Sequence, residues 1–424
     1  MNIYEELENK FKIVYPDNPN ATYVSILNYS DDLLKPFQRW FRYKEGYSIE
    51  LVYKILEENN LTSGLVLDPF SGSGTTSLAC NNRGIDSIGF EVNPFTFFLS
   101  SLKLNEFAAT EIYEFEENIN RVLFINKTKC VELPKRDMMK NVFSEKMENE
   151  FLSIKYNIVY LKLSEKVKNL FLLGWLSLIE VFSNYKKSGN GLKKRNVKLK
   201  YEDKYCFIDE LNKLYNNILS DIKISKRNSN ISLIKDTCLK LDNYIDKNSL
   251  DGVIFSPPYA NCFDYTEIYK LELWFGDFVS NINDLKELRN LSLRSHLNSN
   301  LIDNEIIKSS YLENLLDKLS EKKLWDKRIP TMLRLYFNDL FTLLNKLNYA
   351  MKKNAFCNII VSNSAYGGIV IPTDLLIANY ANDIGFDVKK IEIDRYIITS
   401  SQQYKETLNY KNYLRESVIC LIKK

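Results

Sequence analysis

The sequence predicts an α/β fold, a doubly wound and mainly parallel sheet with helical insertions. Short apolar runs of strand length alternate with helical segments, and turn residues follow several of these runs. Alternating strands and helices are typical of parallel sheets that carry helices on both faces. A chain of 424 residues can bury a large core and exceeds one minimal domain.

The first half of this sheet is expected before residue 105. Apolar side chains recur at helical spacing over residues 30–60, and Gly64 then breaks the chain before the first strand. The elements expected after the break are strands at Leu65–Leu67 and Ser87–Phe90, a helix at Thr75–Asn82 and a helix that begins at Pro94.

Two interruptions separate the remaining sheet segments. Residues 106–228 are mostly helical and charged, and residues 279–330 are polar and rich in leucine. Outside them the expected strands are Ile231–Ile234, Val253–Phe255, Phe356–Val361, Val388–Ile393 and Val418–Leu421, and the expected helices are Met332–Met351 and Asp374–Asp383. The chain therefore divides into sheet segments at 1–105, 229–278 and 331–424, with insertions at 106–228 and 279–330.

Composition excludes several classes of protein. Charged residues make up 26% and hydrophobic residues 45%, as in ordinary soluble proteins, and no run of 18 apolar residues predicts a membrane span. The N-terminus is acidic and lacks the apolar run of a secretory signal. Seven cysteines show no metal spacing, which favours reduced thiols in a cytoplasm and no metal site. A single histidine, His296, argues against a His-rich zinc site and is expected to be a polar surface residue.

A glycine-rich turn follows the first strand. Residues 68–76 read Asp-Pro-Phe-Ser-Gly-Ser-Gly-Thr-Thr. Gly72 and Gly74 allow positive φ and a close approach to a ligand, and the next helix offers free N–H groups. No lysine follows Gly74, as a nucleoside-triphosphate loop requires, and Ser77 occupies the place of the third glycine of a dinucleotide fingerprint. The turn therefore predicts a different cofactor site, the alternative being a tight turn without a ligand.

A second loop, Ser-Pro-Pro-Tyr at residues 256–259, follows the strand at Val253–Phe255. The exocyclic amine of a nucleobase is a poor nucleophile, because its lone pair is delocalised into the ring. The Ser256 hydroxyl and the Pro257 carbonyl can accept its hydrogens, and two prolines, Pro257 and Pro258, limit reorganisation of the loop. Tyr259 can stack on a base that has been flipped out of a duplex. The alternative is a proline-rich turn without chemistry.

With these two motifs the sequence resembles the amino-methyltransferases that use S-adenosylmethionine to methylate DNA, and its serine resembles the cytosine-N4 type. The resemblance implies a Rossmann-like sheet in which Asp68 binds the methionyl ammonium, Glu91 accepts the ribose hydroxyls and Asp236 accepts the adenine amino group. Further cofactor-binding residues implied are Pro69, Phe70, Gly72, Gly74, Thr75 and Asn93. The catalytic residues implied are Ser256, Pro257, Pro258 and Tyr259. Unlike the separate family that methylates cytosine C5, the chain has no Pro-Cys dipeptide.

A basic stretch at residues 186–204 predicts contact with DNA. It carries eight lysines and arginines against two carboxylates, although the net charge of the chain is only +3. The candidate phosphate contacts are Lys186, Lys187, Lys193, Lys194 and Arg195. The alternative is a solvated charged face. Arg289, Arg294 and His296 are weaker candidates.

The resemblance implies double-stranded DNA as the partner, with a cognate restriction endonuclease as a possible companion in the same system. Serine at the first position of the loop is only a tendency, so N6 of adenine stays open. An amine of RNA also stays open, as does a catalytically silent DNA-binding module that retains the fold.

Overall fold

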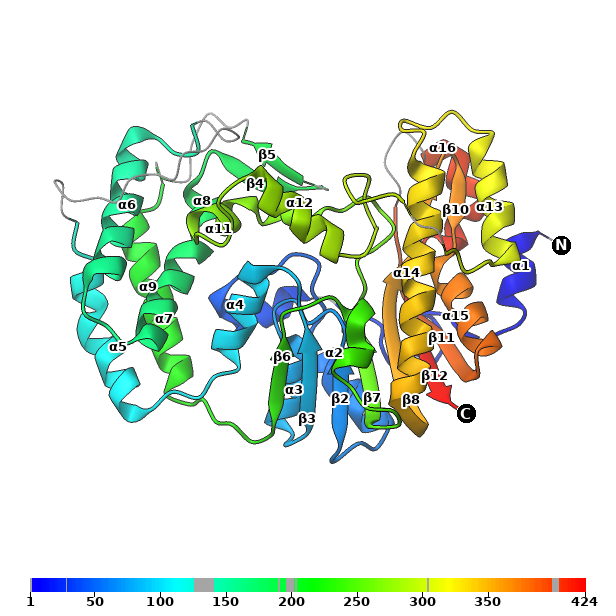
Figure 1. Cartoon of the computed structure of the whole chain (residues 1–424), viewed down its shortest axis with the longest axis horizontal. Helices are drawn as coiled ribbons and strands as arrows, with labels where there is room; N and C mark the ends of the chain where they lie inside the picture. Colours follow the sequence, from blue (N-terminus) through cyan, green and yellow to red (C-terminus); the bar gives the residue numbers. More distant parts are fainter. Residues whose placement is uncertain are drawn as a thin grey trace.

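The computed structural model describes residues 2–27, 29–125, 141–189, 191–195, 202, 204–302, 305–398 and 404–424. Within these ranges eight strands form one central sheet, in the order β1-β11-β12-β8-β7-β2-β3-β6 (Figure 1). The strands are β1 (Ile13–Val14), β2 (Leu65–Asp68), β3 (Asp86–Phe90), β6 (Ile231–Ile234), β7 (Leu250–Phe255), β8 (Met351–Ser362), β11 (Phe386–Tyr396) and β12 (Arg415–Lys423). The run from β8 to β6 is parallel, and β12 is antiparallel to both β8 and β11. The predicted fold class is confirmed.

Helices cover both faces of this sheet. Alternate residues of each strand point to opposite sides, so apolar side chains on both faces pack against helices. Leu67 and Val253 belong to a core shared with α14, whereas Val66 and Ile254 belong to a core shared with α2 and α3. The helices that pack around the sheet are α1 (Ile3–Glu8), α2 (Ile49–Glu58), α3 (Thr75–Asn82), α4 (Pro94–Lys103), α13 (Ser310–Ser320), α14 (Ile329–Ala350) and α15 (Thr373–Asp383). The sheet is therefore doubly wound.

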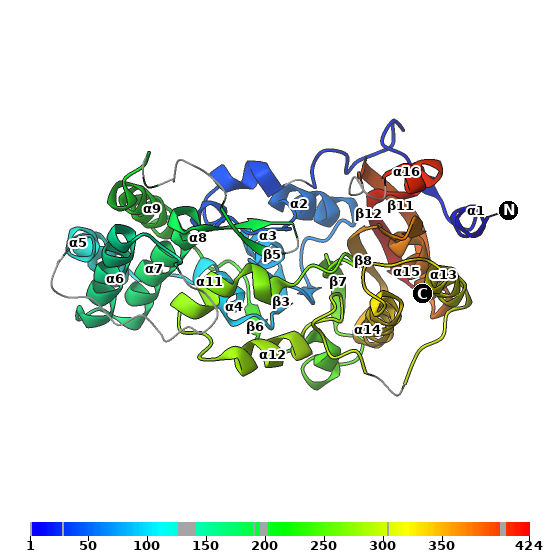
Figure 2. The same ribbon diagram turned by 90° about the horizontal axis from the view of Figure 1, so that it is seen from above.

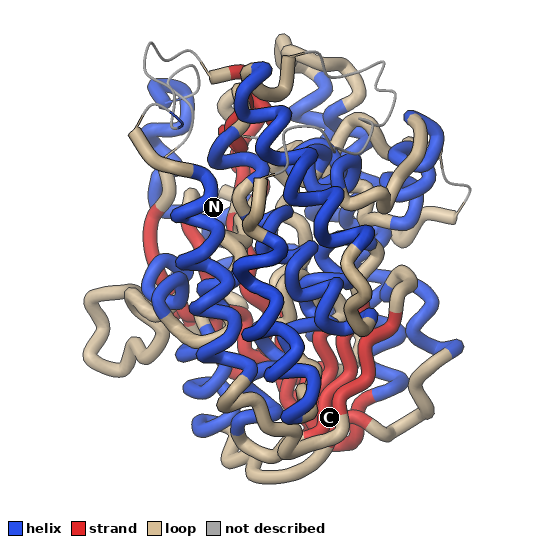
Figure 3. Tube along the Cα trace, turned by 90° about the vertical axis from the view of Figure 1, so that its left-hand side faces the viewer, coloured by secondary structure: helices blue, strands red, loops and turns tan. Residues whose placement is uncertain are grey.

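A helical body with a core of its own lies beside the sheet. Its helices are α5 (Ala109–Val122), α6 (Glu145–Tyr160), α7 (Glu165–Ser177), α8 (Ile179–Phe182) and α9 (Phe207–Ile222). Their apolar faces meet those of α4 and of α11 (Lys270–Phe275) in one cluster. From above, this body and the α13–α14 side lie at opposite ends of the molecule (Figure 2). Seen from the side of the body, helices stand in front of the strands (Figure 3).

The connections on the upper side of the sheet carry shorter elements. They are the hairpin of β4 (Tyr185–Ser188) and β5 (Gly191–Lys194), the hairpin of β9 (Ser364–Tyr366) and β10 (Ile369–Ile371), and the helices α10 (Tyr265–Ile268), α12 (Ile282–Leu291) and α16 (Tyr404–Thr407). In Figure 1 the hairpin of β4 and β5 lies above the sheet, near α11 and α12. No helix among the described ranges is both long and apolar enough to cross a membrane.

Local signals explain where the helices near the site begin. The Ser48 hydroxyl accepts a hydrogen bond from Leu51 N at 3.2 Å and caps α2. Asn93 caps α4 in the same way, with Pro94 in the first turn. Gly74, with φ of 80°, precedes α3 in a conformation that disfavours residues with a side chain.

The prediction of a helix over residues 30–60 is wrong in its first part. Only α2 is an α-helix there; residues Tyr29–Leu34 and Gln38–Trp40 form short 3₁₀ turns, and residues 41–48 are irregular, with a turn at Lys44 and Glu45. Asp221 on α9 explains the departure, because its carboxylate accepts hydrogen bonds from Phe37 N and from the side chains of Arg39 and Trp40. These contacts tie the segment to the helical body, so tertiary structure overrides the spacing.

Candidate active site

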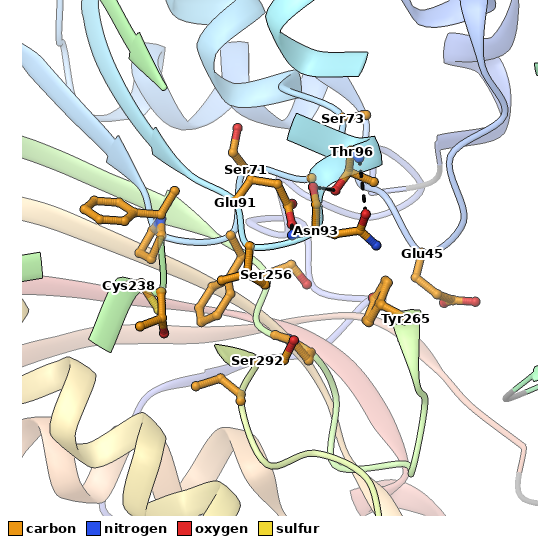
Figure 4. A pocket seen from close by; sticks show the side chains of 18 of the residues that line it. Glu45, Ser71, Ser73, Glu91, Asn93, Thr96, Cys238, Ser256, Tyr265 and Ser292 are labelled. Atoms are coloured by element: carbon orange, nitrogen blue, oxygen red, sulfur yellow. Dashed lines mark hydrogen bonds between the residues drawn. The ribbon is translucent and has the colours of Figure 1, made fainter. Parts of the chain in front are cut away.

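A cavity lies at the carboxyl ends of four neighbouring parallel strands. Phe70 follows β2, Glu91 follows β3, Asp236 follows β6 and Ser256 follows β7, and all four line the same space. Figure 4 shows Glu91 and Ser256 facing this space from different strand ends. Ligands of open α/β sheets bind in such a place, outside the carboxyl ends of the strands. We call this space the first cavity.

The glycine-rich turn forms the floor of the first cavity. Gly72 and Gly74 adopt φ of 50° and 80°, so both occupy the left-handed region. A Cβ at Gly72 would lie 2.8 Å from Tyr43 Oη. Ser71 N donates to Phe90 O at 2.8 Å, which fixes the turn to the end of β3. The turn therefore admits no larger residue at Gly72 without moving Tyr43.

Buried Lys103 supports the turn from below. Its Nζ donates to Ser73 O at 2.7 Å and to the side-chain oxygen of Gln38. Gln38 in turn donates to Thr75 Oγ1 at 3.1 Å. Burial lowers the pKa of Lys103 to about 7, and Asp32 partly offsets the shift. No sequence motif pointed to this lysine, because its partners lie in other elements.

Two carboxylates at the strand ends differ in exposure. Glu91 lines the first cavity, and its Oε1 accepts Asn93 N at 2.7 Å. Asp68 is buried below the cavity floor, where it accepts Tyr47 Oη at 2.8 Å and Phe70 N at 2.9 Å. Burial raises the pKa of Asp68 to about 6 and that of Glu91 to about 7, against hydrogen bonds that lower both. Such shifts are typical of functional carboxylates.

The residues expected at the cofactor are thus largely brought together. Those that line the first cavity are Pro69, Phe70, Gly72, Thr75, Glu91, Asn93 and Asp236. Asp68 and Gly74 lie behind this lining. Asp236 already accepts hydrogen bonds from Thr237 N at 2.7 Å and Tyr244 Oη at 2.8 Å and pairs with Lys240, and these contacts lower its pKa despite burial.

A second cavity adjoins the first. Five residues line both cavities: Tyr43, Glu45, Gly46, Tyr47 and Ser256. Charged side chains of both signs surround the second cavity: Arg42, Lys44, Lys187 and Arg395 with Glu45, Glu180 and Glu416. Of the Ser-Pro-Pro-Tyr loop, Pro258 faces the first cavity, Tyr259 the second and Ser256 both, whereas Pro257 is buried behind them. The loop therefore stands between the two spaces.

Stacked tyrosines form one wall of the first cavity. The rings of Tyr43 and Tyr269 lie 5.6 Å apart at 15°, and those of Tyr265 and Tyr269 lie 6.5 Å apart at 22°. Lys44 N donates to Tyr269 Oη at 2.9 Å. Tyr43 and Tyr47 belong to neither of the two motifs, and they come from residues 41–48, a segment that was predicted to be helical. Leu288 to Ser295, which help to line the cavity, carry no motif that could have revealed them.

The described first part of the basic stretch, up to Lys194, belongs to the hairpin of β4 and β5, which lies over part of the site. Lys186, Lys193 and Lys194 are exposed, and Lys186 lies directly opposite Lys193. Lys187 points inward, where it pairs with Glu272 at 2.5 Å with side-chain exposures of 5% and 1%. Lys187 is therefore not available to a phosphate in this structure. Arg195 is held by the carbonyl oxygens of Tyr185 and Glu180, and Lys198 and Lys200 lie outside the described residues.

Three weaker expectations do not fit the structure. His296 is buried rather than a surface residue, with Nε2 4.0 Å from Asp264. Arg289 pairs with Asp264 at 2.8 Å, and Arg294 pairs with Asp339. Both arginines therefore serve ion pairs inside the fold.

The first cavity offers groups that fit S-adenosylmethionine. The Glu91 carboxylate can accept hydroxyl hydrogens, and the open backbone at Gly72 permits a close approach. Ser71 Oγ is buried and has no hydrogen-bond partner among the described residues, so a polar ligand atom could satisfy it. The tyrosine wall provides a flat apolar surface for a nucleoside.

The fold and this donor set fit the class of S-adenosylmethionine-dependent methyltransferases. The sequence model of a DNA methylase family, N6_N4_Mtase, matches residues 9–99. Type II methyltransferase M.BsoBI of Geobacillus stearothermophilus is 29% identical, and the match covers 86% of this chain and 82% of the relative. Type II methyltransferase M.AvaI of Nostoc sp. is 26% identical with the same coverage. For Type II methyltransferase M.MvaI of Kocuria varians the identity is 22%, over 73% of this chain and 72% of the relative.

These matches confirm the resemblance seen in the two motifs. The matches and the two motifs together support an amino-methyltransferase of the N4/N6 DNA type with S-adenosylmethionine as its methyl donor.

Proposed function

We propose that the chain methylates the exocyclic N4 amine of cytosine in duplex DNA at a specific sequence. The observation that carries this proposal is the position of Ser256, which lines both cavities. One cavity then holds the cofactor and the other holds the target base. A base inside a duplex cannot reach such a site, so the cytosine must be flipped out.

On the cofactor side, Glu91 accepts the ribose hydroxyls and Asp236 accepts the adenine amino group. Asp68 binds the methionyl ammonium. The Asp68 oxygens accept bonds from Tyr47 and Phe70, and a carboxylate has about four acceptor positions. Because Asp68 lies behind the cavity lining, that lining must shift for the ammonium to reach it. When bound, S-adenosylmethionine supplies a methyl group on a sulfonium, an electrophile that leaves a neutral thioether.

On the substrate side, the loop prepares the amine for attack. Ser256 Oγ and Pro257 O accept the amino hydrogens, which favours a more tetrahedral nitrogen as the new bond forms. Tyr259 stacks on the base, and the two prolines hold the loop in one conformation. Direct transfer between groups held close together needs no covalent intermediate with the protein.

Exposed cations of the hairpin hold the DNA backbone. We assign this role to Lys186, Lys193 and Lys194, because they face solvent beside the second cavity and Lys187 does not. Two lysines directly opposite each other, Lys186 and Lys193, repel in the absence of an anion, and a phosphate between them relieves that repulsion. The helical insertion at 106–228 is then the part that presents these cations.

The base assignment has a direct test. The chain is incubated with methyl-labelled cofactor and mixed-sequence duplex DNA, and the DNA is digested to nucleosides and separated. We expect the label in N4-methyldeoxycytidine. Label in N6-methyladenine alone would overturn the choice of base but leave the enzyme class intact, and transfer to tRNA or rRNA without transfer to DNA would favour the RNA alternative.

Two substitutions separate the roles of the cavities. Asp68→Ala should abolish cofactor binding, whereas Tyr259→Ala should bind cofactor normally and lose transfer. Equal loss of cofactor affinity in both variants, measured by calorimetry, would contradict this division.

We further propose a cytoplasmic restriction–modification role, with an endonuclease that recognises the same sequence, since the relatives bear Type II methyltransferase names. DNA from cells that express the chain should resist that endonuclease. Cleavage at the methylated sites would contradict the pairing.

A further inference from the structure

A chain of hydrogen bonds leads from the loop to a carboxylate far away in sequence. Ser256 Oγ donates to Tyr259 Oη at 3.4 Å, and Tyr259 Oη donates to Glu416 Oε1 at 2.8 Å. Arg395 Nε donates to the other oxygen of Glu416 at 2.8 Å. All four residues line the second cavity. Glu416 lies at the start of β12, beside Arg395 on β11.

The direction of these bonds matters for the chemistry. A carboxylate can only accept, so the hydroxyl hydrogen of Tyr259 must point to Glu416. The oxygen of Tyr259 is then free to accept the hydrogen of Ser256. As a result, Ser256 Oγ turns its lone pairs toward the cavity, which is the state needed to accept a hydrogen from an amine. Without Glu416, Ser256 could equally point its own hydrogen at the amine.

We infer that Glu416 is a positioning residue for methyl transfer, and that Ser256, Tyr259 and Glu416 form a relay for the proton that the amine loses. The inference rests on the proposed methylation of an amine. The nitrogen lone pair forms the N–C bond as the methyl group leaves the sulfur, and one N–H bond breaks. The proton passes to Ser256 Oγ, the Ser256 proton passes to Tyr259 Oη, and the Tyr259 proton passes to Glu416.

Before the step, the positive charge of Arg395 balances the negative charge of Glu416. The transferred proton then makes Glu416 neutral. Apo hydrogen bonds of catalytic groups are often long and tighten when substrate binds, which suits the 3.4 Å separation of Ser256 and Tyr259. The open second cavity then allows solvent to remove the proton from Glu416.

The test uses the full chain and three variants: Glu416→Gln, Tyr259→Phe and the double variant. Glutamine keeps the shape of the side chain but can donate to Tyr259, and phenylalanine keeps the ring but removes the hydroxyl. Asp387→Asn is the matched control, a 43% exposed carboxylate on β11 that pairs with Lys389. Single-turnover methylation rates and the affinity for S-adenosylmethionine are measured for each.

We expect each single variant to lose at least tenfold in rate while cofactor affinity stays within twofold. The double variant should be no slower than the slower single variant, because both changes break the same relay. The control should match the wild type. The relay would be overturned if either single variant methylates at the wild-type rate, or if the two rate losses multiply in the double variant. It would also be overturned if the variants lose affinity for S-adenosylmethionine in parallel with the rate.

The test of the relay can fail or succeed independently of the test of the methylated base. Rates are compared on whichever base the wild type methylates, so label on adenine corrects the base and leaves the relay test valid. A wild type that methylates no nucleic-acid amine would overturn both.

Discussion

Replacing Gly72 by alanine tests how the glycine-rich turn shapes the cofactor cavity. Gly72 has φ of 50°, and an L residue in this region costs about 1–2 kcal/mol. Its new Cβ would lie 2.8 Å from Tyr43 Oη and 3.0 Å from Tyr43 Cζ. Overpacking of this kind costs about 1–3 kcal/mol more. Because Tyr43 stacks on Tyr269 and lines both cavities, its displacement should also weaken cofactor binding by about tenfold or more.

Gly84 provides a matched control for the backbone. It also lies in the left-handed region, with φ of 70°, but the nearest atom to a Cβ there is Asn228 O at 3.8 Å. Gly84→Ala should therefore lose only the backbone cost of about 1–2 kcal/mol and bind cofactor normally. The free energy of unfolding is measured in urea, and cofactor affinity by calorimetry. Equal destabilisation of the two variants with unchanged affinity in both would refute the reasoning.

Three further predictions follow from charges in and around the site. Burial raises the pKa of Glu91 to about 7, and its ionised form can accept both ribose hydroxyls; cofactor affinity should therefore rise by up to about tenfold per pH unit below pH 7 and level off above it. In calorimetry, Glu91→Gln should lose the part of this dependence near pH 7 and keep only the part that Asp68, with a pKa of about 6, contributes. Lys187→Met leaves the Glu272 carboxylate buried without its partner and should cost about 3–5 kcal/mol of unfolding free energy, much of which a second change, Glu272→Met, should restore. Lys186→Ala and Lys193→Ala should each reduce the slope of log affinity for DNA against log salt by about 0.9, in filter-binding titrations at several salt concentrations. The first prediction is contradicted if the cofactor affinity of the wild type does not change with pH. The second is contradicted if the losses of unfolding free energy from Lys187→Met and Glu272→Met add in the double variant. The third is contradicted if neither lysine variant changes the salt dependence of DNA affinity.

The sheet could be predicted from the sequence because its central strands are short apolar runs followed by turn residues. Leu65–Leu67 matches β2 closely, and Val253–Phe255 matches the second half of β7. The start of β7 was missed because Asp251 and Gly252 are not apolar. Asp251 accepts Leu65 N at 2.9 Å, and Gly252 lies where a Cβ would be 2.3 Å from the Phe356 ring. Those constraints come from neighbouring strands and leave no local pattern.

The site was predictable only where its residues lie in continuous motifs. The glycine-rich turn and the Ser-Pro-Pro-Tyr loop carry their chemistry locally. Tyr43 and Glu416 do not, because each reaches the cavities through long-range contacts. The same holds for Lys187, whose positive charge predicts a DNA contact but whose pairing with Glu272 depends on the packing of two distant segments.

The antiparallel placement of β12 has a consequence for biosynthesis. β12 separates β8 from β11, although β11 leaves the ribosome first. A nascent chain must therefore keep the edge of β8 unpaired until β12 arrives, and it lacks Glu416 until then. Glu416, and with it the proposed relay, is therefore added to the chain after every residue that lines the first cavity.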